Sequence, residues 1–142
     1  MPGYDVQQDL GDHEAVVKSH SLYEKEPGKL VLAFRFQFKD GEVGNKDFYP
    51  IASEKSEQLT RKALRAMGFD IDKRDLGDLG KNETLLAGQA VKLVVQEHEW
   101  NGQITNRIAF VNAIPKPATA GSLAEATKRL RAAKKGGSDD EL

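Results

Sequence analysis

The chain has 142 residues and no cysteine, with 21 Lys and Arg against 22 Asp and Glu, and 39% of its residues are hydrophobic. This length fits one domain with tails, and such a domain can bury enough apolar surface to fold without disulfides or a structural metal. The sequence shows neither the basic-then-apolar pattern of a signal peptide nor the roughly 20 apolar residues of a transmembrane helix. We therefore expect a cytoplasmic protein without a cofactor.

Charged residues divide the chain into parts. Residues 1–115 hold 15 basic and 18 acidic residues, residues 116–137 hold six basic and one acidic, and residues 138–142 carry a net charge of −3. The overall net charge of −1 argues against a simple electrostatic nucleic-acid binder, but a segregated distribution keeps that class open. We expect an amino-terminal extension over 1–11, a folded domain over 12–115, a basic linker and helix over 116–137 and a disordered acidic tip over 138–142.

Three antiparallel strands are predicted before Pro50. The strongest signal covers residues 29–39, where apolar side chains recur at every second position, as in a strand with one buried face. This pattern places five side chains in the core: Leu30, Leu32, Phe34, Phe36 and Phe38. Asp40-Gly41 predicts a hairpin turn into a strand over 42–49, and residues 14–23 are expected to form the strand before it.

One helix is predicted after Pro50. Apolar residues recur at helical spacing between Leu59 and Met67, with Ser53 as an N-cap and Gly68 as the end. Residues 69–88 are rich in Asp and Gly but carry apolar anchors, so we expect a packed connection there.

Two further strands follow, over residues 89–100 and 103–114. They are separated by Asn101-Gly102, a strong hairpin signal. After Pro115 a linker leads to a second helix, whose capping-box pattern predicts a start at Ser122 and whose one side is basic.

The predicted order of elements is typical of one fold. Three strands, a helix and two strands within about 100 residues match the OB-fold, a five-stranded barrel with one helix between its third and fourth strands. An open antiparallel sheet with the helix on one face has the same order, so both architectures stay open at this point.

Several short motifs carry a resemblance. They are Gly11–Val17, the aromatic-alternating Leu30–Phe38, Leu64–Phe69, Leu86–Val91 and Trp100–Gly102. Together they resemble bacteriophage single-stranded-DNA-binding proteins of OB-fold type, over roughly residues 11–114. The resemblance implies sequence-independent binding of single-stranded DNA in phage replication or recombination, in the host cell cytoplasm.

A single-strand binder needs cations that follow phosphates and aromatic rings that stack on bases. Basic side chains on the outward face of the second predicted strand and in neighbouring loops and strands are candidates: Lys25, Lys29, Arg35, Lys39, Lys46, Lys92 and Arg107. The candidate stacking residues are Tyr23 and Trp100, each beside a predicted loop, and Tyr49, which should point outward because Phe48 points inward.

The acidic tip has a separate expected role. The tails of the resembling proteins contact replication and recombination partners, which makes this tip a candidate partner site: Asp139, Asp140, Glu141 and Leu142. The basic arm before it could add affinity for DNA, hold the tip, or be a solvated helix.

Enzyme signatures are missing from the sequence, so we expect a protein that is not an enzyme. The histidines are scattered and no phosphate-binding glycine loop occurs. A magnesium-dependent nuclease built on Asp70, Asp72, Asp75 and Asp78 is an alternative, although a solvated acidic loop is the favoured explanation of these carboxylates. The main alternative is an OB-like module that binds another protein and no nucleic acid.

Overall fold

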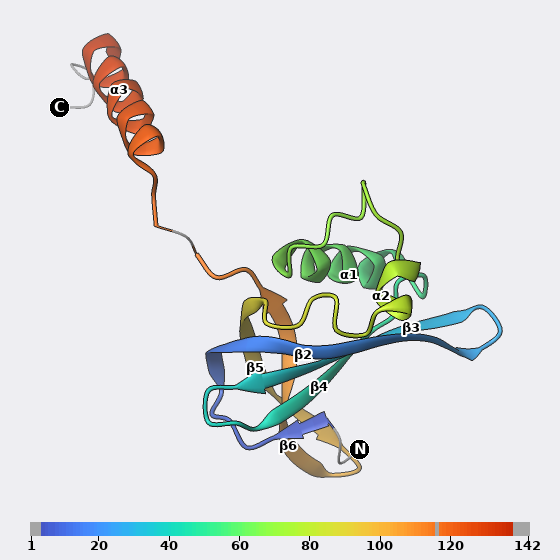
Figure 1. Cartoon of the computed structure of the whole chain (residues 1–142). Coiled ribbons are helices and arrows are strands. Elements are labelled where there is room, and N and C mark those ends of the chain that lie inside the picture. Colours follow the sequence, from blue (N-terminus) through green and yellow to red (C-terminus); the bar gives the residue numbers. More distant parts are fainter. Residues whose placement is uncertain (1–3, 116, 138–142) are drawn as a thin grey trace.

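The computed structural model describes residues 4–115 and 117–137, which form a mainly β body and a projecting helix (Figure 1). The strands are β1 (Asp5–Val6), β2 (Gly11–Glu26), β3 (Lys29–Phe38), β4 (Val43–Phe48), β5 (Ala90–Trp100) and β6 (Gln103–Asn112). The helices are α1 (Glu54–Ala66), α2 (Gly77–Lys81) and α3 (Ala120–Gly137). None of the described helices is long and apolar enough to cross a membrane.

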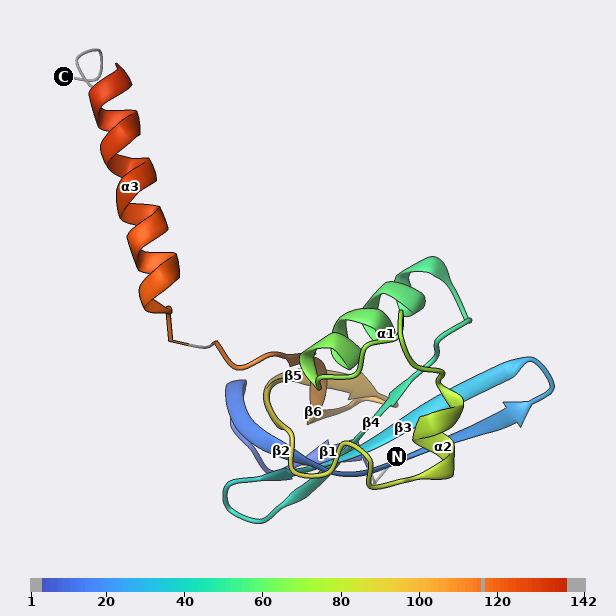
Figure 2. The same cartoon turned by 45° about the horizontal axis from the view of Figure 1, so that its top comes forward.

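All six strands form one antiparallel sheet in the order β1-β6-β5-β2-β3-β4. The long strand β2 pairs with β5 through its first half and with β3 along most of its length, so the sheet curls at β2 into a half-barrel (Figures 1 and 2). The two edges meet at Gly44 of β4, where an added Cβ would lie 2.8 Å from Ile108 and 2.9 Å from Val6. Only glycine lets the backbone approach so closely.

The prediction of five strands was wrong, because the described residues form six. The additional strand is β1, which lies within the expected extension over 1–11 and pairs with β6. A two-residue strand shows no alternating pattern. Its partner strand β6 lies far along the chain, and an ion pair between Asp5 and Arg107, at 3.0 Å, accompanies the pairing.

The predicted core is confirmed in its main part. Phe34, Phe36 and Phe38 are buried, while Leu30 at the hairpin end is only half-buried. The Asn101-Gly102 turn is also confirmed, with φ of 52° and 76°, the left-handed pair that this dipeptide adopts readily.

The helix after Pro50 is confirmed as α1. The Ser53 side chain accepts a hydrogen bond from the Ser56 N–H at 3.1 Å, and Gly68 ends the helix at φ 80°.

The packed connection is confirmed as well, but it includes the short helix α2, which the sequence analysis did not predict. Buried His20 holds this connection on β2. One ring nitrogen contacts the Leu79 carbonyl at 3.0 Å, and the other accepts the Leu86 N–H at 3.2 Å. Because the second nitrogen accepts, the ring is neutral and donates to Leu79.

The final helix begins two residues earlier than predicted. Thr119, not Ser122, caps it, because the Thr119 hydroxyl accepts the Ser122 N–H at 3.0 Å. Every described side chain of α3 up to residue 132 is exposed, and the helix stands away from the body (Figure 2).

Candidate nucleic-acid interface

An aromatic row crosses the outward face of β2, β3 and the end of β4. Tyr23 pairs with Val31, and Tyr49 follows Phe48, whose partner is Leu32, so the register places Tyr49 beside Val31. Tyr23 is 46% exposed and Tyr49 is 42% exposed, whereas Phe48 is buried, as predicted. The row therefore presents two tyrosines to solvent on either side of an apolar floor.

This row lines a groove of about 630 Å³, which we call the tyrosine groove. The wall on one side comes from β2, β3 and β4, and the other from β5 and β6. Five of the predicted binding residues line it together: Tyr23, Lys25, Lys46, Tyr49 and Arg107. In Figure 1 the β2–β3 turn extends to the right of the body, and the β5–β6 turn lies at its lower edge.

The groove contains a third tyrosine that the sequence analysis missed. Tyr4 lies just before β1, and its hydroxyl donates a hydrogen bond to the carboxylate of Asp47. This hydrogen bond, burial and the negative charge of Asp47 together raise the pKa of Tyr4 above its usual range. No periodic pattern surrounds Tyr4, so only its pairing through β1 reveals its place.

The basic residues of the groove differ in their surroundings. Arg107 is held by Asp5, and its guanidinium lies 6.0 Å from the ring centroid of Tyr4. The pKa of Lys46 is lowered because the residue is half-buried, and its amine lies 5.6 Å from the Phe48 ring centroid. Lys25 is exposed near the β2–β3 turn.

Acidic groups also line this groove, so its charge is mixed. Asp47 and Glu97 lie among its lining residues. Three basic and two acidic residues line it, so the groove is an aromatic surface with a net charge of only about +1, better suited to stacking than to capturing a polyanion by charge alone.

A second hollow of about 390 Å³ adjoins the groove and contains Arg35. The two hollows share Tyr4, Tyr23 and Asp47, so they form one continuous surface. Lys25, Arg35 and Lys46 take part in none of the ion pairs formed between residues that the structure describes.

Trp100 lies at the tip of the β5–β6 hairpin and is 56% exposed. It follows Gln96 and His98 at period two, and both of these residues line the tyrosine groove. Trp100 therefore extends the same face of β5 beyond the groove.

Three predicted cations lie elsewhere, each in an ion pair. Lys29, at the β2–β3 turn, contacts Glu26 at 3.3 Å. At the other end of the sheet, Lys39 contacts Glu14 at 2.8 Å and Lys92 contacts Asp12 at 3.7 Å. We call this second region, Lys39, Lys92 and their two carboxylate partners, the paired end.

The acidic connection after α1 has contacts of its own. Asp70 accepts the N–H of Asp72 at 3.0 Å, and Asp78 pairs with Arg74 at 3.3 Å. Within the described part of the chain, no group of three or more His, Asp or Glu side chains is arranged to hold a metal ion.

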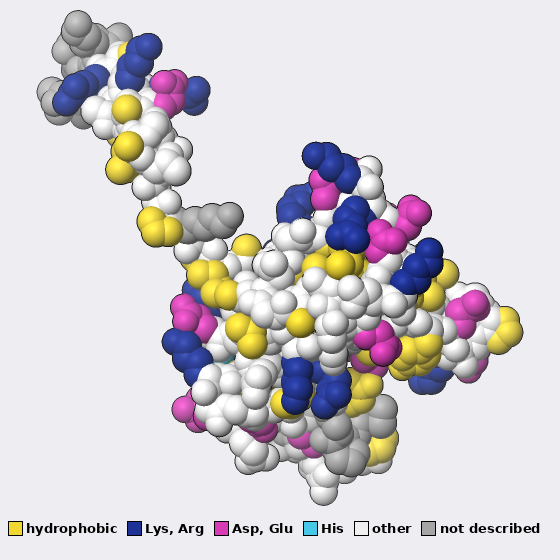
Figure 3. Space-filling view, viewed as in Figure 1, with side chains coloured by type: hydrophobic (Ala, Val, Ile, Leu, Met, Phe, Trp, Pro, Cys, Tyr) yellow, Lys and Arg dark blue, Asp and Glu magenta, His cyan; other side chains and the backbone are white. Residues whose placement is uncertain are grey.

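The predicted partner site in the tip, Asp139, Asp140, Glu141 and Leu142, lies outside the described residues. Figure 3 shows basic and acidic side chains interleaved over the body, whereas the described part of α3 is mainly basic. Its exposed cations are Lys128, Arg129 and Arg131, of which Arg129 pairs with Glu125 at 2.9 Å.

The geometry suits an extended ligand that brings flat rings to the tyrosines and negative charge to nearby cations. In comparisons with known proteins, the chain matches no protein-family model and no curated protein.

Proposed function

We propose that this chain is an OB-type single-stranded-DNA-binding protein of sequence-independent specificity, acting in phage DNA replication or recombination within the host cell. Strands β2 to β6 follow the strand order of an OB barrel, with β1 as an addition and α1 after the third barrel strand. In such barrels, the face of the second and third strands and two hairpin loops bind oligonucleotides. Here these are the face of β3 and β4 and the turns after β2 and β5.

The observation that carries the proposal is the position of the tyrosine groove on that face. Tyr4, Tyr23 and Tyr49 offer rings within one exposed hollow, and Lys25 and Lys46 lie beside them. Bases of any sequence have flat faces, so stacking on these rings gives affinity without sequence preference, while the cations contact phosphates. Trp100 would extend stacking along the strand.

The basic arm and acidic tip have supporting roles in this proposal. Exposed Lys128 and Arg131 on α3 would add phosphate contacts. The tip, residues 139–142, would recruit replication or recombination proteins.

The experiment is a binding titration of labelled oligo-dT at several salt concentrations, with duplex DNA as a control. Each phosphate contact on a single strand contributes about −0.7 to the salt slope, so Lys25, Arg35 and Lys46 together predict about −2 from the groove. We expect saturable binding that favours the single strand. Absence of binding at low salt would contradict the proposal.

The second candidate is a protein-interaction module, and the carboxylates of Asp47 and Glu97 in the groove favour it. Such a module would bind a partner protein through the same tyrosines, because tyrosine is enriched in protein interfaces. It would show no retention on immobilised single-stranded DNA at low salt.

A further inference from the structure

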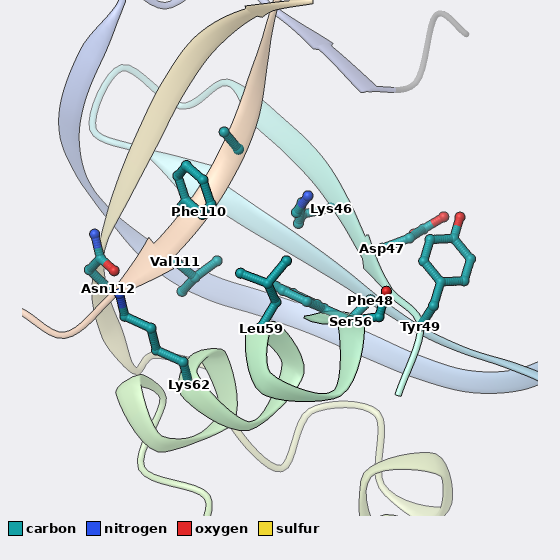
Figure 4. Close-up of a pocket in the computed structure, with 11 residues that line it drawn as sticks. Lys46, Asp47, Phe48, Tyr49, Ser56, Leu59, Lys62, Phe110, Val111 and Asn112 are labelled. Carbon is teal, nitrogen blue, oxygen red and sulfur yellow. The ribbon is translucent and has the colours of Figure 1, made fainter. Parts of the chain in front are cut away.

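A smaller cavity, which we call the slot, opens between β4 and β6 where α1 covers them (Figure 4). Its volume is about 120 Å³. The slot and the tyrosine groove share Lys46, Asp47, Tyr49 and Ala109, so the two hollows adjoin each other.

The walls of the slot are apolar. They come from Phe48 on β4, Leu59 on α1, and Phe110 and Val111 on β6. In Figure 4, Leu59 points toward Val111, while Asp47 and Tyr49 point together to one side. An apolar cavity of about 150 Å³ can hold benzene. At about 120 Å³ the slot is somewhat smaller than that cavity, so it accepts at most one six-membered ring and is too small for a fused purine.

Polar groups line the slot at both ends. The Asn112 side-chain oxygen is buried and has no hydrogen-bond partner among the described residues. A buried acceptor without a donor costs free energy, and a ligand N–H would recover it. Lys62 reaches from α1 toward Asn112 (Figure 4), and Lys46 lies on the side of the slot shared with the groove.

We propose that the slot receives one unstacked pyrimidine base of the strand bound in the tyrosine groove, with its ring against Phe110 and Leu59. This inference rests on the proposed function and adds a preference for pyrimidine bases to it. In thymine and cytosine the O2 carbonyl lies next to the sugar bond and an N–H donor lies farther from it, so these groups match the Lys46 ammonium on the groove side and the Asn112 oxygen at the other end of the slot. Size excludes adenine and guanine, so binding should favour pyrimidine-rich strands.

The direct test is photo-crosslinking of the full chain to an oligonucleotide of 5-iododeoxyuridine, with crosslinked residues mapped by mass spectrometry. We expect crosslinks at Phe110 or Phe48 in addition to Tyr23, Tyr49 or Trp100. Crosslinks confined to the latter three would overturn the slot while leaving the proposed function intact. If the chain binds no single-stranded DNA, the proposed function fails, and this inference fails with it.

A variant pair gives a second readout. Phe110→Ala should weaken binding of oligo-dT about five- to tenfold, the lower part of the range for one stacked base, with less than about a twofold change for oligo-dA. Ile104→Ala, at an exposed apolar position of the same strand, is the control and should change neither. Asn112→Ala replaces Phe110→Ala if the latter fails to fold. Equal losses for both oligonucleotides, or no loss, would contradict the slot.

Discussion

The two ends of the sheet use the same residue types in different ways. At the paired end, Lys39 and Lys92 each contact a carboxylate, and the bond from Lys39 lowers the pKa of Glu14. In the tyrosine groove, Lys25 has no such partner among the described residues and lies beside exposed rings. The difference separates cations whose charge a neighbouring carboxylate already balances from cations that have no such partner.

The largest expected effect comes from removing the stacking row. The double variant Tyr23→Ala/Tyr49→Ala should weaken oligo-dT binding by about 30-fold or more, because each of the two stacked bases contributes about 1–3 kcal/mol. Fluorescence anisotropy measures the change. The matched control is Val16→Ala, an exposed apolar residue of β2 that lines a different surface beside Lys39. Similar losses in both variants would remove the distinction between the two ends.

The second prediction tests how tightly β4 packs against β1 and β6 at Gly44, where the two edges of the sheet meet. Gly44→Ala adds a Cβ 2.8 Å from Ile108, which also lines the groove, so the variant should lose about 1–3 kcal/mol of unfolding free energy through overpacking. Urea unfolding measures this loss. Gly77→Ala is the control, because nothing lies within 4 Å of its added Cβ and its backbone is unstrained. Equal stability of the two variants would mean that the edges are not tightly packed.

Charge reversal compares the two ends directly. Lys25→Glu or Arg35→Glu should weaken oligo-dT binding for all sequences alike and reduce the salt slope by about 1. Lys39→Glu should weaken binding less, because Glu14 already balances Lys39. Salt titrations of the three variants beside Lys73→Glu, on the far connection, give the measurement. A larger effect at Lys39 than at Arg35 would reverse the assignment of the binding face.

The smallest effect is the pH dependence of stability from His20. Burial lowers the pKa of His20 below its ordinary value of 6.5, so the folded ring stays neutral where the unfolded ring takes up a proton. This contribution to stability is full above pH 6.5 and falls as the pH drops below that value. Urea unfolding between pH 7.5 and about 5 should show the decline.

The control is His98→Gln, an exposed position, which should keep the same decline. His20→Gln should flatten part of it. An unchanged pH profile in His20→Gln would show that the ring is not held neutral by Leu79 and Leu86.

Local signals in the sequence predicted most of the body. Period-two alternation over residues 29–39, the Ser53 cap and the Asn101-Gly102 turn depend on neighbouring residues only, and each is confirmed. The strand β1 and the Thr119 cap were not predicted. The partner of β1 is β6, about a hundred residues away, and the Thr119 cap competed with a stronger pattern at Ser122.

In the candidate site, too, the features set by neighbouring residues could be predicted, and those set by distant strands could not. Exposure of Tyr23, Tyr49 and Trp100 follows from alternation and turns. The place of Tyr4 and the ion pair of Lys39 depend on which strands meet in space. A sequence pattern could therefore suggest the binding residue types, but not which cations were already paired.

The most direct test of the account uses Trp100, the only tryptophan of the chain. Its fluorescence is followed while the protein is titrated with oligo-dT at low and high salt, with duplex DNA and a gel mobility assay in parallel. The account predicts quenching that saturates with the single strand, is weak with duplex and reverses at high salt. An unchanged fluorescence together with no mobility shift would contradict it and favour the protein-interaction module.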